Sequence, residues 1–442
     1  MIPSRRVYLW LVGGTIAGMI AATLGGDFIN PRLLGWSILA TLGFDAVVLL
    51  AMAIDGFSTR AHRVTVTRDS LQRLSIGRDN PVKLTVQTSD RPAIIQIRDN
   101  YPQAFQVSEA THTLSLSAQK TQEITYTAMP FQRGEYKWGN LQVRQLGRWG
   151  LAWDDWKSPQ QQTVAVYPDL IGLRSLSIKL TLQTSGNIRR ARRQGMGTEF
   201  AELRDYGTGD DPRLIDWKAT ARRNRVLVKV LEPEQEQTLV VLLDRGRLMT
   251  AQVKGLARFD WGLNATLSLA LAGLQRGDRV GIGVFDRQMT TWVPPERGQT
   301  QLAKLIETLT PIQPVLLEPD YLGAVTTVAT RQTRRALVVL ITDVIDEIAS
   351  AELLAAMSRL SSRHLPFCVT LRDPQVDAKA HSLTTTIPDT YARAVALDLL
   401  SQRQLALEKL KQKGVLILDA PANQISEDLV DRYLQLKARN QL

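Results

Sequence analysis

Two long apolar runs near the N-terminus constrain the fold of this chain more than any other feature. Residues 7–25 and residues 33–54 are rich in Leu, Val, Ile, Ala and Gly, and each is close to the roughly 20 residues that cross the hydrocarbon core of a bilayer. The segment between them, residues 26–32, is long enough only for a tight turn. The first run also lacks the small-residue cleavage site of a signal peptide. We therefore predict a two-helix transmembrane hairpin within residues 1–60.

Basic residues flank this hairpin at both ends, whereas the predicted turn contains only Arg32. By the positive-inside rule, this asymmetry places both termini in the cytoplasm. The formal charge of +11 suits an anionic neighbour, either nucleic acid or acidic lipid, and the apolar runs favour lipid. The flanking residues are Arg5 and Arg6 before the first run, and Arg60, Arg63 and Arg68 after the second.

One acidic residue, Asp45, interrupts the second apolar run. A carboxylate in the middle of a membrane helix costs about 2.5–3.5 kcal/mol on insertion scales, so it needs a partner. One interpretation is a hydrogen bond within the hairpin, for example to Thr15, or a position nearer to an interface. The other is a contact in an oligomer or with a second membrane protein.

Residues 64–170 alternate between apolar and polar side chains with a period of two, the pattern of half-buried strands. Turn residues separate these segments at short intervals, and we therefore predict an antiparallel β-sandwich module. The predicted strands include residues 82–87, 94–98, 113–117, 122–127 and 163–167.

Residues 235–442 alternate strands with helices, which predicts an α/β domain with a mostly parallel sheet covered on both faces. Two continuous apolar strands, residues 238–244 and 336–343, each end in a carboxylate, Asp244 and Asp343. Ligands of such sheets bind at the carboxyl ends of the strands. We therefore regard this edge of the sheet as a candidate site.

Two carboxylates at adjacent strand ends could hold a divalent cation such as Mg²⁺, because hard cations favour oxygen ligands. After Asp244, Gly246 and Leu248 stand where hydroxyls would help to bind a cation, and Arg245 and Arg247 would repel it. The alternative interpretation is that Asp244 and Asp343 pair with these arginines or with backbone amides.

Residues 171–234 form a charged linker, with eleven basic and six acidic residues between positions 186 and 229. Three interpretations are open: a structural clasp that docks the linker on the α/β domain, a partner-binding surface, or a catalytic pocket. The basic cluster between Arg189 and Arg225 could also bind nucleic acid or anionic lipid. The candidate partner-binding residues are Arg204, Asp205, Asp210, Asp211, Arg213, Asp216 and Trp217.

Enzyme signatures are missing from the sequence. It has no Gly-x-x-x-x-Gly-Lys phosphate loop, no His-Glu-x-x-His pair and no Gly-x-Ser-x-Gly nucleophile elbow. We therefore expect a protein that is not an enzyme, with no cofactor other than the Mg²⁺ considered above.

The stretch from Arg204 to Trp217, with its Asp-Pro-Arg-x-Ile-Asp-Trp core, resembles the bacterial "domain of unknown function 58" family. The resemblance extends to the hairpin, the sandwich and the tail at 432–437. It implies a von Willebrand factor A-like domain after about residue 235. It also implies a partner of the MoxR-type AAA+ ATPase class, because family members are often encoded beside such ATPases.

The resemblance bears on the metal hypothesis as well. A complete metal-ion-dependent adhesion site in this fold reads Asp-x-Ser-x-Ser, with a separate Thr and Asp. Asp244 and Asp343 match that pattern, whereas Gly246 and Leu248 do not, and Asp320 lies near the place expected for the Thr.

Our first hypothesis is a multi-pass protein of the bacterial plasma membrane that receives a cytoplasmic partner, a MoxR-type AAA+ ATPase, without catalysing a reaction. The first alternative is a metal-dependent binding module or enzyme that uses Asp244 and Asp343. The second is binding of nucleic acid or anionic lipid by the basic cluster; of the two we do not expect nucleic acid.

Overall fold

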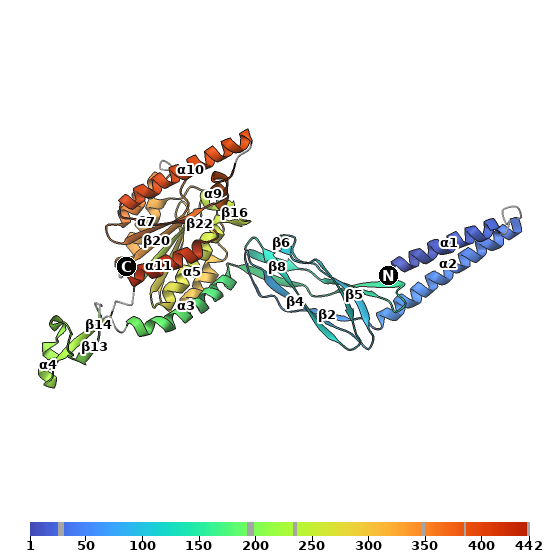
Figure 1. The fold of residues 1–442 in the computed structure, drawn as a ribbon, viewed down its shortest axis with the longest axis horizontal. Helices are drawn as coiled ribbons and strands as arrows, with labels where there is room; N and C mark the ends of the chain where they lie inside the picture. Colours follow the sequence, from blue (N-terminus) through green and yellow to red (C-terminus); the bar gives the residue numbers. More distant parts are fainter. Residues whose placement is uncertain (25–30, 192–198, 233–236, 346–349, 384–385, 440–442) are drawn as a thin grey trace. The chain divides into compact units, whose positions relative to one another are not determined.

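The computed structural model describes residues 1–24, 31–191, 199–232, 237–345, 350–383 and 386–439. The chain divides into two compact units, residues 1–166 and residues 167–442 (Figure 1). The predicted hairpin and sandwich lie in the first unit, and the predicted linker and α/β domain lie in the second.

The hairpin consists of α1 (Arg5–Leu24) and α2 (Pro31–Arg60). Both helices are long and apolar enough to cross a membrane, by length and composition. The helices approach closely at two glycines, because a Cβ on Gly14 would collide with the Phe44 ring and one on Gly18 with the Thr41 hydroxyl. Most of the predicted turn at 26–32 lies outside the described residues.

The sandwich-like region contains three antiparallel sheets whose strands alternate buried and exposed residues. This confirms a β-rich region between the hairpin and the α/β domain. The first sheet has the order β1 (Ile2–Pro3), β11 (Ala152–Ser158), β10 (Leu141–Leu146), β5 (Ala93–Asp99), β7 (Thr111–Leu116). The second has the order β2 (Thr65–Arg68), β4 (Asn80–Gln87), β8 (Thr121–Pro130), β6 (Phe105–Val107), and the third β3 (Arg73–Ser75), β12 (Gln162–Tyr167), β9 (Gly134–Trp138).

Asp55, in the last part of α2, joins the hairpin directly to the sandwich. Its side chain is buried and accepts hydrogen bonds from the backbone N–H groups of Trp149 (3.0 Å), Leu151 (3.0 Å) and Ala152 (3.3 Å). A Cβ at Gly147 would collide with the same carboxylate, so the turn there requires glycine. The chain therefore passes from helix to sandwich through a hydrogen-bonded joint.

The arginines that follow α2 also take part in this unit. Arg63 pairs with the buried Asp154 at 2.8 Å, Arg60 pairs with the same residue at 3.5 Å, and Arg68 pairs with Asp99 at 3.0 Å. Three of the arginines that predict the membrane orientation thus have structural partners. The cytoplasmic position of both termini stays a prediction.

The α/β domain is built on a six-stranded sheet in the order β19-β18-β15-β20-β21-β22. Five strands are parallel, as predicted, and the edge strand β19, which the sequence did not indicate, is antiparallel. The strands are β15 (Thr238–Asp244), β18 (Arg279–Phe285), β19 (Met289–Glu296), β20 (Leu337–Thr342), β21 (Leu365–Arg372) and β22 (Leu416–Pro421).

Helices cover both faces of this sheet, and an apolar core lies on each side (Figure 1). Leu239, Val241 and Leu243 of β15 face one core, while Val240 and Leu242 face the other. The first core is covered by α3 (Leu170–Ala191), α5 (Arg258–Gln275), α6 (Gln299–Leu309) and α11 (Ile425–Ala438). The second is covered by α7 (Tyr321–Arg331), α8 (Ala351–Leu360) and α10 (Ile387–Gln412), and α9 (Pro374–Ala380) packs against α10.

The segment predicted as a charged linker is largely regular structure, which corrects that prediction. Its first part is α3, which buries Leu173 and Leu180 in the first core. These residues lie seven apart, on one helical face, among polar neighbours that conceal the period. The rest is the signature hairpin, which we define as β13 (Glu199–Asp205), the 3₁₀ helix η2 (Pro212–Leu214), α4 (Trp217–Arg223) and β14 (Leu227–Glu232).

We expect Asp55→Ala to destabilise the first unit by at least about 2 kcal/mol, because it leaves buried N–H groups without an acceptor. Thermal unfolding of the detergent-solubilised chain, with hydrogen exchange at residues 147–152, measures this effect. Asp79→Ala is the matched control because Asp79 is exposed; it should change stability by less than about 0.5 kcal/mol. Equal stability of the two variants would contradict a structural role for Asp55.

Candidate functional site

The carboxyl ends of β15 and β20 bring Asp244 and Asp343 to the same edge of the sheet, as predicted. The two strands are parallel neighbours, with Leu243 opposite Ile341. Asp244 is fully buried. Its carboxylate accepts hydrogen bonds from the backbone N–H of Gly246 (2.7 Å), the Thr342 hydroxyl (2.7 Å) and the Tyr321 hydroxyl (3.3 Å).

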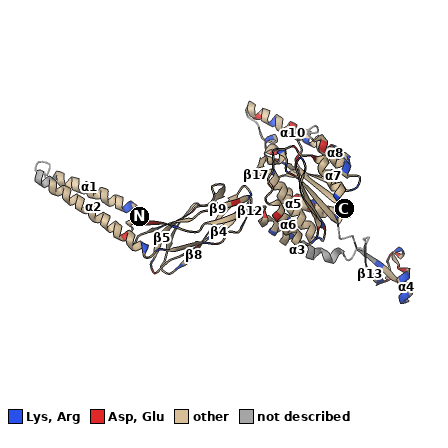
Figure 2. Ribbon diagram, turned by 180° about the vertical axis from the view of Figure 1, so that it is seen from behind, with Lys and Arg blue, Asp and Glu red and all other residues tan. Residues whose placement is uncertain are grey.

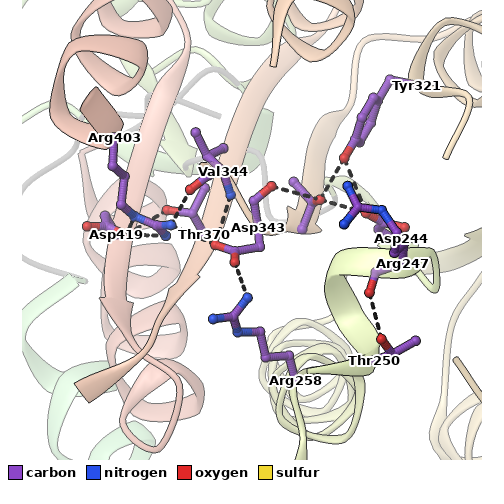
Figure 3. A network of polar contacts seen from close by, with 11 residues as sticks. Asp244, Arg247, Thr250, Arg258, Tyr321, Asp343, Val344, Thr370, Arg403 and Asp419 are labelled. Carbon is purple, nitrogen blue, oxygen red and sulfur yellow. Dashed lines mark hydrogen bonds and ion pairs between the residues drawn. The ribbon is translucent and has the colours of Figure 1, made fainter. Parts of the chain in front are cut away.

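Two guanidinium groups from opposite helical layers hold Asp343 (Figure 3). Arg258 is the first residue of α5, and its Nη1 bonds to Oδ2 of Asp343. Arg403 of α10 donates from Nη1 to Oδ1 of Asp343 at 2.7 Å and from Nη2 to Asp419 at 2.8 Å. The backbone N–H of Val344 completes the set at 2.8 Å. Both carboxylate oxygens of Asp343 thus accept hydrogen bonds from the protein itself.

The arginines predicted to neutralise this edge have other partners. Arg245 pairs with Asp286 at 2.9 Å, and Arg247 pairs with Glu318 at 2.5 Å. The prediction that Asp244 and Asp343 accept hydrogen bonds from backbone amides agrees with the structure. The prediction that Arg245 and Arg247 pair with them is wrong, because Arg258 and Arg403 form the ion pairs with Asp343.

This donor set does not fit a resident Mg²⁺. No group of three or more His, Cys, Asp or Glu side chains that could hold a metal occurs among the residues that the structure describes. Asp320, the further candidate, caps α7 by accepting from the N–H of Gly323 at 2.7 Å. Because two guanidinium groups already neutralise Asp343, a divalent cation beside it would be repelled.

Burial raises the pKa of Asp244 to about 6. Hydrogen bonds from Thr342 and Gly246 lower this pKa, and the charge of Asp343 raises it further. Burial also raises the pKa of the Tyr321 hydroxyl, and the charge of Asp244 raises it further. Asp244 is therefore a buried acid that titrates above its ordinary range.

Within the signature hairpin, the carboxylates hold the segment itself together. Asp210 accepts hydrogen bonds from the N–H of Gly207 at 2.7 Å and from Arg204 at 2.6 Å, and these bonds lower the pKa of Asp210. Asp211 caps η2, and Asp216 caps α4 by accepting from the N–H of Ala219 at 3.0 Å. Two further ion pairs link Arg225 to Asp205 (3.1 Å) and Lys229 to Asp216 (3.4 Å). These acids were predicted to bind a partner, but their contacts give them a folding role.

Other side chains of the signature hairpin face solvent. Trp217 is 69% exposed and Tyr206 is 41% exposed. Lys218, Arg222 and Arg223, which were not among the predicted partner-binding residues, are also exposed. These three residues belong to the basic cluster from Arg189 to Arg225, which was the feature of the sequence that could have indicated them. The side chains of residues 183–201 lie outside the described part.

Asp45 does not make the hydrogen bond considered from the sequence. The Thr15 hydroxyl donates instead to the carbonyl of Val12, one turn earlier in its own helix, at 2.8 Å. Oδ1 of Asp45 has no hydrogen-bond partner among the residues described. A hydroxyl that can reach a carbonyl of its own helix is commonly satisfied there, and this explains the wrong pairing.

The fold and these sites define a mixed α/β protein with a β-sandwich-like region and two apolar N-terminal helices. Its residues 202–380 match the model of the family described as "Protein of unknown function DUF58". This region of the chain is similar to that family, which confirms the resemblance seen in the signature.

Curated relatives match part of the chain. "Uncharacterized protein Rv1480" of Mycobacterium tuberculosis (strain ATCC 25618 / H37Rv) is 24% identical over 183 residues, which are 41% of this chain and 57% of that protein. "Uncharacterized protein Mb1516" of Mycobacterium bovis gives the same values. The chain thus spans 57% of the length of these bacterial relatives.

Solved structures are similar only at a distance. The CARDB domain of the PF1109 protein from Pyrococcus furiosus has a TM-score of 0.18 and 13% identity, covering 24% of this chain and 93% of that one. Proximal thread matrix protein 1 from the mussel byssus has a TM-score of 0.28 and 9% identity, covering 45% and 46%. Neither likeness bears on function.

We expect the stability gap between the natural chain and Asp244→Asn to depend on pH. Because the folded pKa of Asp244, about 6, lies above its ordinary 3.8, the folded state binds this proton more tightly than the unfolded state. Protonation of Asp244 therefore adds up to about 3 kcal/mol to the free energy of unfolding. This contribution is complete below about pH 4 and is lost as the pH rises through about 6. Urea unfolding, followed by hydrogen exchange in β15 and β20 at matched pH, measures this gap. A gap that stays constant from pH 4 to 7 would rule the assignment out.

We also expect calorimetric titration with Mg²⁺ or Mn²⁺ to give no heat that depends on Asp244 or Asp343. Arg258 and Arg403 already neutralise the edge where a cation would bind. The variants Asp244→Ala and Asp343→Ala, with the exposed Glu307→Ala as control, should give the same signal as the natural chain. Binding heat that vanishes in the first two variants and persists in the third would restore the metal hypothesis.

Proposed function

We propose that this chain is a membrane-anchored scaffold that presents a von Willebrand factor A-like α/β domain to a cytoplasmic protein partner. Its α1 and α2 would span the bacterial plasma membrane, with both termini in the cytoplasm. The partner class is a MoxR-type AAA+ ATPase. The role is non-enzymatic: the chain binds and positions its partner.

The observation that carries this proposal is the occupied edge of the α/β sheet. In folds of this kind, ligands bind at the carboxyl ends of the strands. Here Asp343 is 4% exposed and held by Arg258 and Arg403, while Asp244 is held by Thr342 and Gly246. An edge filled by its own side chains favours binding through an outer protein surface over chemistry in a pocket.

The joint at Asp55 supports the anchoring part of the proposal. The carboxylate fixes residues 149–152 of the sandwich to the end of α2. The N-terminal strand β1 pairs with β11 beside them, with Ile2 opposite Trp153. A hairpin held at both of its ends would present the sandwich in a fixed direction from the membrane.

Crosslinking in native membranes tests the proposal. The full chain is captured after crosslinking, with and without ATP, and the recovered proteins are identified by mass spectrometry. We expect an AAA+ ATPase whose recovery changes with nucleotide, since such ATPases change conformation on binding it. An unrelated two-span membrane protein, captured in parallel, provides the background. Absence of any ATPase above that background, in both nucleotide conditions, would refute the proposal.

A further inference from the structure

The described part of the signature hairpin has more cations than its own carboxylates use. Three basic side chains pair internally, namely Arg204 with Asp210, Arg225 with Asp205, and Lys229 with Asp216. In residues 202–229 the others have no ion pair, and all of them are exposed. They are Arg213, Lys218, Arg222 and Arg223. Figure 2 shows the Lys and Arg positions of α4 in blue.

Trp217 lies among these cations with 69% of its surface exposed. Trp is on average a well-buried residue, and exposed Trp and Arg side chains that lie together are typical of protein interfaces. The Asp216 cap fixes where α4 begins, and therefore where Trp217 lies. Trp217 and Ala221 are four residues apart, so they share one face of α4; Lys218 and Arg222 form the adjacent row.

The inner side of α4 is fixed by a separate contact. The Thr220 hydroxyl accepts a hydrogen bond from the N–H of Leu227, the first residue of β14, at 3.0 Å. Leu227 and Val228 are buried in the hairpin. The aromatic and cationic side chains can therefore engage a partner without unfolding the hairpin.

We propose that Trp217, Lys218 and Arg222, with Arg213 of η2, form a docking surface for an acidic segment of the protein partner. That segment would bring carboxylates to the cations and an apolar side chain to the indole. This inference rests on the proposed function, since it gives the chemistry of the partner of that scaffold. We name these four residues the Trp217 surface.

Charge complementarity and residue type support this occupant. Arg and Trp contribute most of the binding energy in many protein interfaces, and guanidinium groups form paired hydrogen bonds with carboxylates. A uniformly anionic surface, such as a lipid bilayer or a nucleic acid, would also meet the exposed carboxylates of Glu202 and Asp211 in the same short segment. An acidic peptide with spaced carboxylates avoids that repulsion.

Binding of a defined peptide tests the surface directly. The full chain, in nanodiscs of neutral phosphatidylcholine, is titrated into a fluorescent peptide of alternating Glu and Leu residues, and anisotropy is measured. We expect Trp217→Ala and the double variant Arg213→Glu/Arg222→Glu each to weaken binding by at least about tenfold. Arg359→Glu, an exposed charge reversal on α8, should bind like the natural chain. A peptide with Lys in place of Glu should not bind.

Several outcomes would overturn the assignment. These are equal binding by all variants, no peptide binding by the natural chain, or preferential binding to phosphatidylglycerol vesicles or to a single-stranded oligonucleotide. Thermal unfolding confirms that each variant is folded, which the exposure of Trp217 and Arg222 leads us to expect. If the double charge reversal does not fold, Lys218→Gln/Arg222→Gln replaces it, with the same expected loss.

The crosslinking capture, repeated with the double variant, separates this inference from the proposed function. If the natural chain and the variant recover the same ATPase equally, the Trp217 surface is wrong and the scaffold stands. If neither recovers an ATPase but peptide binding is lost in the variants, the ATPase partner is wrong and the surface stands. Recovery by the natural chain alone supports both.

Discussion

The carboxylate of Asp343 lies at the end of β20, where water is almost excluded, and two helices supply its counter-charges. Arg258 begins α5 on one face of the sheet, while Arg403 comes from α10 on the other. One buried acid thus ties both helical layers to the central strands. Removing one partner of a buried pair costs about 3–5 kcal/mol, because it leaves a charge without compensation. The network thus ties α5, α10 and β22 to the end of β20.

The first unit also contains a buried carboxylate that is held by several hydrogen-bond donors. Asp99 of the sandwich is buried, yet it accepts hydrogen bonds from Arg68 at 3.0 Å, Tyr126 at 2.6 Å and Trp138 at 3.0 Å. Burial raises the pKa of Asp99 in spite of these donors, and burial lowers the pKa of Arg68. Asp55 uses backbone N–H groups for the same purpose. In each of these cases a buried acid is held by hydrogen-bond donors of the protein itself.

The sequence predicted the features that depend on residues close together along the chain, and it missed those that depend on residues far apart. Local periodicity identified the apolar helices, the sandwich strands and the parallel strands that bring Asp244 and Asp343 together. It missed α3, whose apolar positions are diluted by charges, and the ion-pair partners of the sheet edge. Arg258 and Arg403 lie 85 and 60 residues from Asp343. Spacing along the chain favoured Arg245 and Arg247, because nothing local encodes a contact made by packing.

The signature stretch shows why a motif rich in charge is easily read as a binding site. Asp211 and Asp216 each precede a helix by one residue, the position from which a carboxylate satisfies free N–H groups at a helix start. Their spacing is therefore set by backbone geometry. What this geometry leaves exposed is an indole and a row of cations. The acids of the motif hold the segment in its fold, and the indole and most of the cations, which follow Asp216, have no such role.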